Sequence, residues 1–167
     1  MAEKRSPFIK NVSETEPRDL KHGKKFAGTK KALAAESGAQ QLGCSWMEIP
    51  PGAQAFPHHS HFANEEEFFI LSGEGTVRLG DEKFQVHAGD YIACPAGEAA
   101  HSLINTGNEP LRYLAISTTH GTDIVVYPDS KKFLAVGGGN MHKGMRTSKF
   151  VRILKDQMDV DYYLDEE

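Results

Sequence analysis

Four residues of this chain have the types and the spacing of a metal site: His59, His61, Glu66 and His101. Alternate side chains of a β-strand share a face, so an extended segment would point His59 and His61 the same way. Glu66 begins the segment EEFFIL, which is typical of a second strand. An inward carboxylate without a partner is costly to bury, and a bound cation removes that cost. The pattern therefore predicts a metal ion held between the histidines and Glu66.

The chemistry of such a site follows from its donor atoms. Three neutral imidazoles and one carboxylate suit a single divalent transition metal ion, such as Zn, Mn, Fe or Ni, and leave it with about one net positive charge. An ion with open positions polarises a carbonyl or hydroxyl oxygen, activates water or, if it is iron, binds dioxygen. The sequence does not choose the metal, and it identifies no catalytic base.

Two stretches of the chain resemble the two motifs of the cupin superfamily. The first motif is a glycine, a His-x-His pair, a glutamate and a second glycine, matched here by Gly52, His59, His61, Glu66 and Gly73. The second motif is a glycine, a Pro-x-Gly turn, a histidine and an asparagine, matched by Gly89, Pro95, Gly97, His101 and Asn105. Six residues rather than the usual five separate Gly52 from His59, and three rather than two separate Gly97 from His101. Both loops thus carry one extra residue, while all four metal ligands of the motifs are present.

This resemblance implies an all-β fold, the double-stranded β-helix or cupin jelly-roll barrel, with the metal on His59, His61, Glu66 and His101. The short segment between the motifs is similar to that of small single-domain bacterial cupins, some of which are provisionally described as sugar-phosphate isomerases. In such an enzyme the metal would hold two adjacent oxygens of the sugar, and Arg78 and Lys83 could anchor its phosphate only if their strands turn them toward the barrel mouth. An iron-dependent dioxygenase and a non-catalytic small-molecule-binding or sensing cupin remain alternatives.

The elements that must position these residues are short strands separated by turn residues. We expect strands in nine segments: QLGCSWMEI, AFPHHSH, EEFFILS, GTVRLG, EKFQVHA, DYIACP, AHSLIN, LRYLAIST and DIVVYP. Periodicity alone does not distinguish a sandwich from a barrel, and jelly rolls include the cupins. Three regions are expected: residues 1–40 as an irregular N-terminal extension with one helical piece in KKALAAESG, residues 41–130 as the cupin barrel, and residues 131–167 as a C-terminal loop and tail packing on it. Within that tail, FVRILKDQMDVDYYL is expected to form a strand or a short helix.

The other histidines, acidic residues and cysteines are expected to be peripheral. His58 lies on the opposite face from His59 and should be exposed or beside the ligands. The residues expected at the surface are His22, His87, His120 and His142, together with Glu65 and Glu67. Cys94 is either buried packing or a thiol that faces the cavity.

Composition limits the function classes. With 167 residues and 39% hydrophobic content, the chain suits one domain with a sizeable core. The formal charge of -4 and the acidic last segment, DVDYYLDEE, do not resemble a nucleic-acid surface. No apolar secretory or bilayer-length run is present, so a reducing cytoplasmic location without membrane contact is expected. The expected partners are a small polar, carboxylate or sugar-like molecule and a second copy of the chain in a homodimer.

Overall fold

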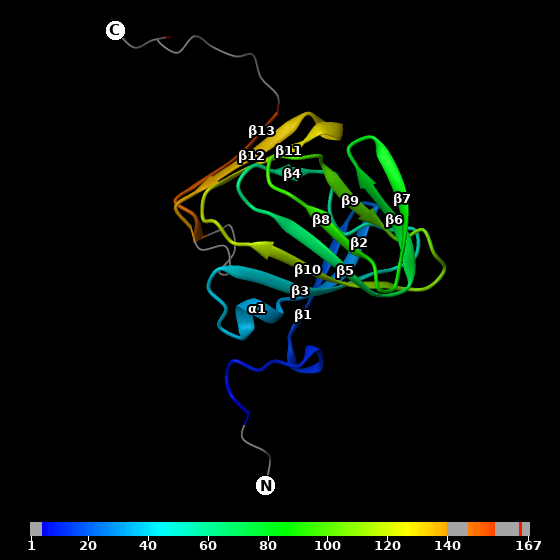
Figure 1. Ribbon diagram of the computed structural model, residues 1–167. Coiled ribbons are helices and arrows are strands. Elements are labelled where there is room, and N and C mark those ends of the chain that lie inside the picture. Colours follow the sequence, from blue (N-terminus) through cyan, green and yellow to red (C-terminus); the bar gives the residue numbers. More distant parts are fainter. Residues whose placement is uncertain (1–4, 140–146, 156–163, 165–167) are drawn as a thin grey trace.

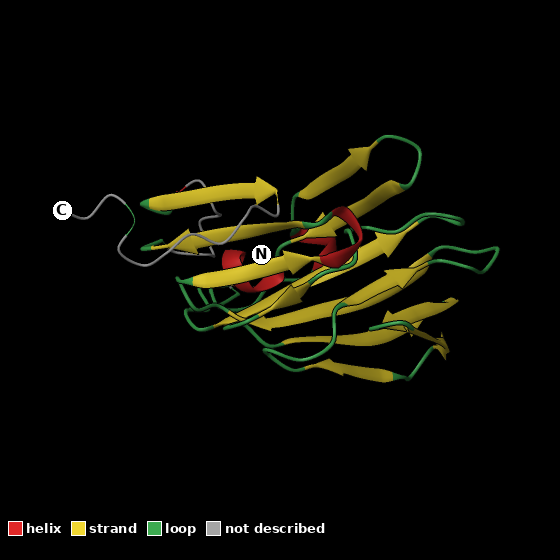
Figure 2. Cartoon of the chain, turned by 90° about the horizontal axis from the view of Figure 1, so that it is seen from above, coloured by secondary structure: helices red, strands yellow, loops and turns green. Residues whose placement is uncertain are grey.

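The computed structural model describes residues 5–139, 147–155 and 164, which form an all-β fold of antiparallel strand pairs (Figure 1). Helices are limited to short turns, as the view from above shows (Figure 2). The turns are η1 (Val12–Glu14), α1 (Leu33–Glu36) and η2 (Pro128–Ser130). Within the described residues, no helix combines the length and the apolar content that crossing a bilayer requires.

One wall of the barrel is a six-stranded sheet with the order β1-β2-β3-β10-β5-β8. Its long central strands pair over most of their length, with Tyr113 opposite both Met47 and Ile70. The strands of this sheet are β1 (Pro17–His22), β2 (Phe26–Lys31), β3 (Leu42–Ile49), β5 (Glu66–Ser72), β8 (Tyr91–Cys94) and β10 (Leu111–Thr118).

The remaining strands form a three-stranded group, β7-β6-β9, and a four-stranded group, β13-β12-β11-β4. An isolated bridge between His59 and His101 joins the two groups. The strands are β4 (Ser60–His61), β6 (Glu74–Leu79), β7 (Glu82–His87), β9 (His101–Ile104), β11 (Asp123–Tyr127), β12 (Lys132–Gly137) and β13 (Phe150–Lys155).

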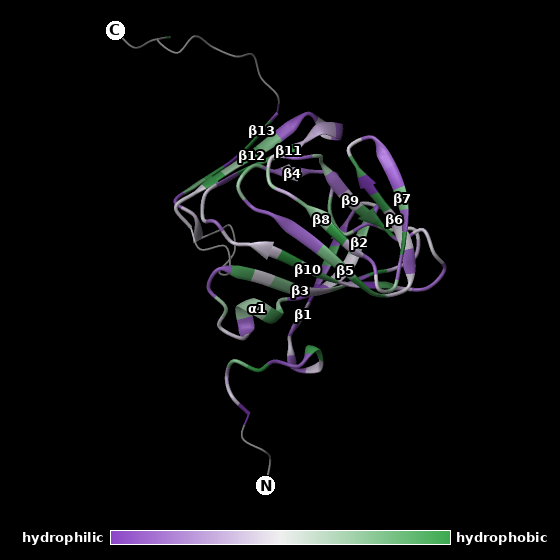
Figure 3. Ribbon diagram, viewed as in Figure 1, coloured by the Kyte–Doolittle hydropathy of each residue, from purple (hydrophilic) through white to green (hydrophobic). Residues whose placement is uncertain are grey.

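Strand β5 shows how alternation builds the core. Phe68 and Ile70 are buried, at 7% and 0% exposure. The alternate residues, Phe69 and Leu71, are exposed. Along the ribbon, β5 changes from hydrophilic at its glutamates to hydrophobic over the rest (Figure 3). Glu66 shares the inner face with Phe68 and Ile70, as the sequence predicts. The all-β barrel is therefore confirmed, and all nine expected segments contain a strand.

The terminal segments hold more regular structure than the sequence predicts. Strands β1 and β2 form a hairpin in the region expected to be an irregular extension, and β12 occupies part of the expected C-terminal loop. The residues FVRILK form β13, so a strand rather than a helix is confirmed there, while residues 156–163 of that expected element lie outside the described residues. The expected helical piece is α1. The hairpin segments PRDLKH and FAGTKK lack apolar alternation. They form strands because β1 pairs with β2 and β2 pairs with β3. Strands thus lie on both sides of each expected boundary, at residues 40 and 130.

Candidate metal centre

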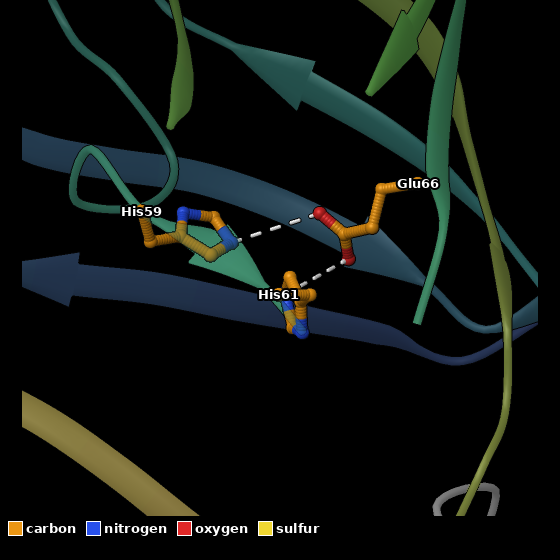
Figure 4. Close-up of side chains that lie close together, drawn as sticks. All are labelled: His59, His61 and Glu66. Carbon is orange, nitrogen blue, oxygen red and sulfur yellow. Dashed lines mark ion pairs between the residues drawn. The ribbon is translucent and has the colours of Figure 1, made fainter. Parts of the chain in front are cut away.

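His59, His61 and Glu66 meet inside the barrel (Figure 4). The Nε2 atom of His59 lies 3.6 Å from Oε2 of Glu66, and Nε2 of His61 lies 3.7 Å from Oε1. One ligand atom from each of the three residues fits within a mutual distance of 4.8 Å. The alternation of the HxH pair and the start of β5 therefore place three of the four expected residues around one point.

His101, from the other motif, contacts Glu66. Its backbone pairs with that of His59 through two hydrogen bonds, from His59 N to His101 O (3.0 Å) and from His101 N to His59 O (2.7 Å). This pairing puts both imidazoles on one face, and Nε2 of His101 lies 3.0 Å from Oε2 of Glu66. His101 contacts Glu66 but lies outside the compact group formed by the other three residues. The complete four-residue ligand set remains a prediction.

Hydrogen bonds at Nδ1 hold two of the rings with Nε2 toward Glu66. Nδ1 of His59 donates to the carbonyl oxygen of Pro57 at 2.7 Å, and Nδ1 of His61 donates to the Asp123 carboxylate at 2.6 Å. Neither oxygen can donate, so in a neutral ring the proton lies on Nδ1 and the lone pair on Nε2. A metal-ligating histidine has this arrangement. The donor set therefore fits a divalent transition metal ion.

Asp123 is a site residue that the sequence motifs do not identify. Its buried carboxylate accepts hydrogen bonds from His61 Nδ1, from the Ala63 backbone amide (2.9 Å) and from the Asn64 side chain (2.8 Å). Burial raises the pKa of Asp123, but these hydrogen bonds lower it more, so the group stays ionised. Alternation along DIVVYP is the available signal, because Asp123 shares the inner face of β11 with Val125.

The charges at the centre act on one another. Burial raises the pKa of Glu66, but contacts with His101 and His59 and the charge of His61 bring it well below its usual range. Burial lowers the pKa of His61, and the Asp123 hydrogen bond and the Glu66 charge outweigh that effect, so the net shift is upward. The pKa of His101 is lowered, chiefly by burial. A carboxylate therefore faces one imidazole that protonates easily and another that resists protonation.

A cavity of about 210 Å³ opens beside Glu66, His59 and His101. Its walls are mainly apolar, with Met47 and Phe68 among them, as in many small-molecule sites.

Lys30 on β2 also lines this cavity. It is absent from the site expected from the sequence, because residues 1–40 are expected to form an extension outside the barrel. Within the described residues, Glu66 is the cavity's one carboxylate and Lys30 its one lysine or arginine. The cavity therefore carries one charge of each sign.

The two conditional candidates for a phosphate anchor, Arg78 and Lys83, lie elsewhere. Arg78 forms an ion pair with Asp129 at 2.8 Å, and Arg78 and Lys83 line a separate cavity together with Lys25. The reason is strand alternation, because Arg78 pairs with Ser102 while the neighbouring Leu79 pairs with His101 on the inner face. The two charges therefore do not turn toward the metal cavity.

Other peripheral residues follow the expectations in part. His58 is buried at 4% exposure, so of the two expected alternatives the exposed one is wrong; it lines the same cavity as Arg78, next to the candidate ligand His59 in the sequence. Cys94 is packed in the core, where burial raises its pKa to about 12. Exposed side chains are found at His22, His87, His120 and Glu65, while Glu67 is partly buried. His142 lies outside the described residues.

Comparisons with known proteins agree with this geometry. The family model of the cupin domain matches residues 45–117. An uncharacterized protein of Methanocaldococcus jannaschii is 34% identical over 100 residues, which cover 60% of this chain and 70% of that protein. An oxalate-binding protein of Thermotoga maritima is 37% identical over 70 residues, covering 42% of this chain and 56% of that protein. The match thus spans little more than half of the Thermotoga protein.

A solved structure from Acidithiobacillus ferrooxidans, whose provisional name is sugar phosphate isomerase, superposes with a TM-score of 0.77. The superposition covers 93% of this chain and 97% of that one at 24% sequence identity, which shows a shared fold. The domain match, the Methanocaldococcus relative and the shared fold show that the chain belongs to the cupin family.

Proposed function

We propose that this chain holds one divalent transition metal ion with His59, His61, Glu66 and His101 and binds a small oxygen-bearing molecule beside it. The observation that carries the proposal is the orientation of the three rings, whose Nε2 atoms face Glu66. Hydrogen bonds at Nδ1 fix two of those rings in the ligating tautomer. A bound divalent ion supplies Lewis acidity toward an oxygen of the ligand.

The ligand class follows from the size and the lining of the cavity. A volume of about 210 Å³ suits a small molecule, and the apolar walls leave few groups to recognise a large polar one. The name of the Thermotoga maritima relative, an oxalate-binding protein, supports a small carboxylate as the ligand. The chain's own residues would orient such a molecule between the imidazoles and the apolar walls.

Sugar-phosphate isomerisation is a narrower form of the proposal, and the provisional name of the Acidithiobacillus protein supports testing it. Proton transfer between neighbouring carbons needs an acid–base group beside the ligands. In the part of the chain that the structure describes, no carboxylate besides Glu66 lines the cavity, and its other titratable side chains besides the histidines are Lys30 and Tyr113. Arg78 and Lys83 lie at a different cavity. Binding of a small carboxylate needs no acid–base group and is the better supported function.

The test measures bound metal and thermal midpoint for the wild type, Glu66→Gln and His101→Ala, each with and without a chelator. Removing the negative ligand or the second-motif ligand should weaken metal binding by about tenfold or more. The midpoint of the metal-loaded protein should fall accordingly, because a ligand that binds only the folded state stabilises it by mass action.

The matched control is His87→Ala, which removes an imidazole that is 64% exposed on another strand. This variant should keep the wild-type metal content and midpoint. If Glu66→Gln and His101→Ala also keep full metal and an unchanged midpoint, the four-residue site is wrong, and the function proposed on it is wrong with it.

A further inference from the structure

Lys30 reaches the metal cavity from the N-terminal hairpin. On β2 it pairs with Met47 of β3, which pairs with Tyr113 of β10, which pairs with Ile70 of β5. Residues directly opposite one another in a sheet share a face. The last three side chains are almost fully buried, so this row lies on the inner face of the sheet. Lys30 is therefore the barrel-facing end of a row of core residues.

The hairpin that carries Lys30 is held on two sides. Strand β2 pairs with β3, and its start is tied to the segment before the HxH pair. There the Ala27 amide donates to the Gln54 carbonyl, and the Gln54 amide donates to the Lys25 carbonyl, each at 3.1 Å. The backbone of Lys30 is thus fixed relative to the strands that carry His59 and Glu66.

The ammonium group of Lys30 has no hydrogen-bonded or ion-paired partner within the described residues, although it is partly buried and lines both cavities that adjoin Glu66. Burial lowers its pKa, and the charge of Glu66 offsets only part of that effect. The neighbouring Lys31 shows the contrast, because its Nζ donates to the Val12 carbonyl at 2.8 Å and lies over the Trp46 ring. A partly buried cation without a close partner loses hydration, and an anionic ligand can replace that lost stabilisation.

We propose that Lys30 recognises the ligand by pairing with an anionic oxygen of a small dianion whose other oxygens lie at the metal. This inference rests on the proposed metal site. Among the groups at the cavity, a divalent ion with Glu66 leaves about one positive charge and Lys30 adds a second, so a dianion balances these three charges. Oxalate and other compact molecules with two acidic groups have the matching charge and size.

Lys30 lies outside the part of the chain that the cupin domain shares. The family match begins at residue 45, while β2 ends at Lys31. The proposed metal ligands thus belong to the matched domain, and the ligand-selecting charge comes from a strand that precedes it. The hairpin has a function at the site as well as a place at the sheet edge.

The experiment titrates oxalate and glycolamide into metal-loaded wild type, Lys30→Met, Lys30→Arg and Lys21→Met by calorimetry, after bound metal is measured. Glycolamide offers two adjacent oxygens without charge. Lys30→Met should weaken oxalate binding at least tenfold, because the positive charge that pairs with the anion is gone. Glycolamide binding and metal content should stay within a factor of about three of wild type. The thermal midpoint of Lys30→Met should be equal to or higher than that of the wild type. Lys30→Arg keeps the charge and should bind oxalate within about tenfold of wild type. Lys21→Met, an exposed position of the same hairpin, should match wild type.

The outcomes distinguish a failure of the Lys30 role from a failure of the proposed metal site. If the wild type holds metal and Lys30→Met binds oxalate as tightly as the wild type, the role of Lys30 is overturned and the metal site stands. A metal-loaded wild type that does not bind oxalate also overturns the recognition of a small dianion. If the wild type holds no metal, the proposed function fails first and the inference fails with it. Should Lys30→Met not fold, weak oxalate binding by folded Lys30→Arg would overturn the charge-based role.

Discussion

Asp123 and His61 are 62 positions apart in the sequence, yet the Asp123 carboxylate accepts a hydrogen bond from Nδ1 of His61 at 2.6 Å. The contact exists because β11 pairs with β4, with Val125 opposite His61. The same carboxylate binds the Ala63 amide and the Asn64 side chain in the connection to β5. One residue therefore orients a candidate metal ligand and fixes the loop that leads to Glu66.

The first prediction concerns this contact. Asp123→Asn replaces a charged acceptor with a neutral one, so the His61 ring is held less firmly and is less basic. Metal affinity at pH 8 should fall roughly 10- to 100-fold, with one ion still bound per chain. Competition with a chelator measures the affinity. Asp129→Asn is the control, because Asp129 pairs with Arg78 away from the centre and should leave affinity unchanged. Equal affinities for Asp123→Asn and the wild type would refute the orienting role.

The second prediction is a pH dependence of metal binding set by His61. Its folded pKa lies above the ordinary 6.5, so protonated His61 stabilises the metal-free protein below that pH, and this stability is lost as pH rises through the folded pKa. A metal ion needs the neutral ring, so affinity should already decline on acidification through pH values above 6.5. His101, whose pKa is lowered, should compete with metal only at lower pH.

Measuring metal affinity and the protons released on metal binding between about pH 6 and pH 8 tests whether His61 titrates at higher pH than His101. Near the ordinary histidine pKa, metal binding should release the proton held by His61. In Asp123→Asn the decline should start at lower pH, because the carboxylate that stabilises the protonated ring is gone. A decline at the same pH in both proteins would contradict the assignment to His61.

The sequence predicts the part of the site that depends on local periodicity. His59 and His61 share a face because they are two apart in an extended segment, and Glu66 faces inward with Phe68 because β5 alternates. His101 also reaches Glu66, as the second motif implies. These placements need only the period of a strand and the match of two motifs.

The remainder depends on which strands become neighbours, and no local pattern carries that information. Asp123 reaches His61 through the pairing of β11 with β4, and Lys30 reaches the cavity because a polar hairpin joins β3. His58 is buried, which excludes the exposed one of its two expected positions, because segments distant in the sequence lie around it. Arg78 shows the same dependence, because its ion pair with Asp129 joins two segments 51 positions apart in the sequence. Tertiary pairing therefore decides each of these positions.

The third prediction compares two motif glycines with positive φ. Gly52 has φ +77° and open space where a Cβ would be added, whereas at Gly73, with φ +83°, an added Cβ would lie 2.7 Å from the Pro110 carbonyl oxygen. Gly52→Ala should lower the free energy of unfolding by about 1 kcal/mol through backbone strain alone. Gly73→Ala should cost roughly 1–3 kcal/mol more, because backbone atoms must move.

Urea denaturation of the metal-free proteins measures both effects without a contribution from metal binding. Gly52→Ala serves as the matched control, since it carries the same strain without the clash. Equal losses in the two variants would show that the Gly73 turn relaxes freely and that close packing against Pro110 does not matter.

The fourth prediction is a homodimer formed by the outer face of the six-stranded sheet. Cross-strand pairing aligns Tyr91 with Phe69, Phe69 with Leu114, and Leu114 with Trp46. Tyr91 is 56% exposed and Phe69 is 37% exposed, so the row presents aromatic surface to solvent. Contiguous exposed apolar surface of this kind is typical of interfaces, and a two-fold pairing covers it on both copies at once.

The wild type should have the mass of a dimer in sedimentation equilibrium at micromolar concentration. Phe69→Lys should weaken the dimer by about 2 kcal/mol or more, roughly thirtyfold in its dissociation constant, because a charge replaces a central aromatic anchor. Phe84→Lys is the matched control, since Phe84 is 47% exposed but lies on β7, outside this sheet. It should stay dimeric, and both variants should keep the metal site, whose residues lie on the inner face. A monomeric wild type, or equal effects of the two variants, would place the interface elsewhere or exclude it.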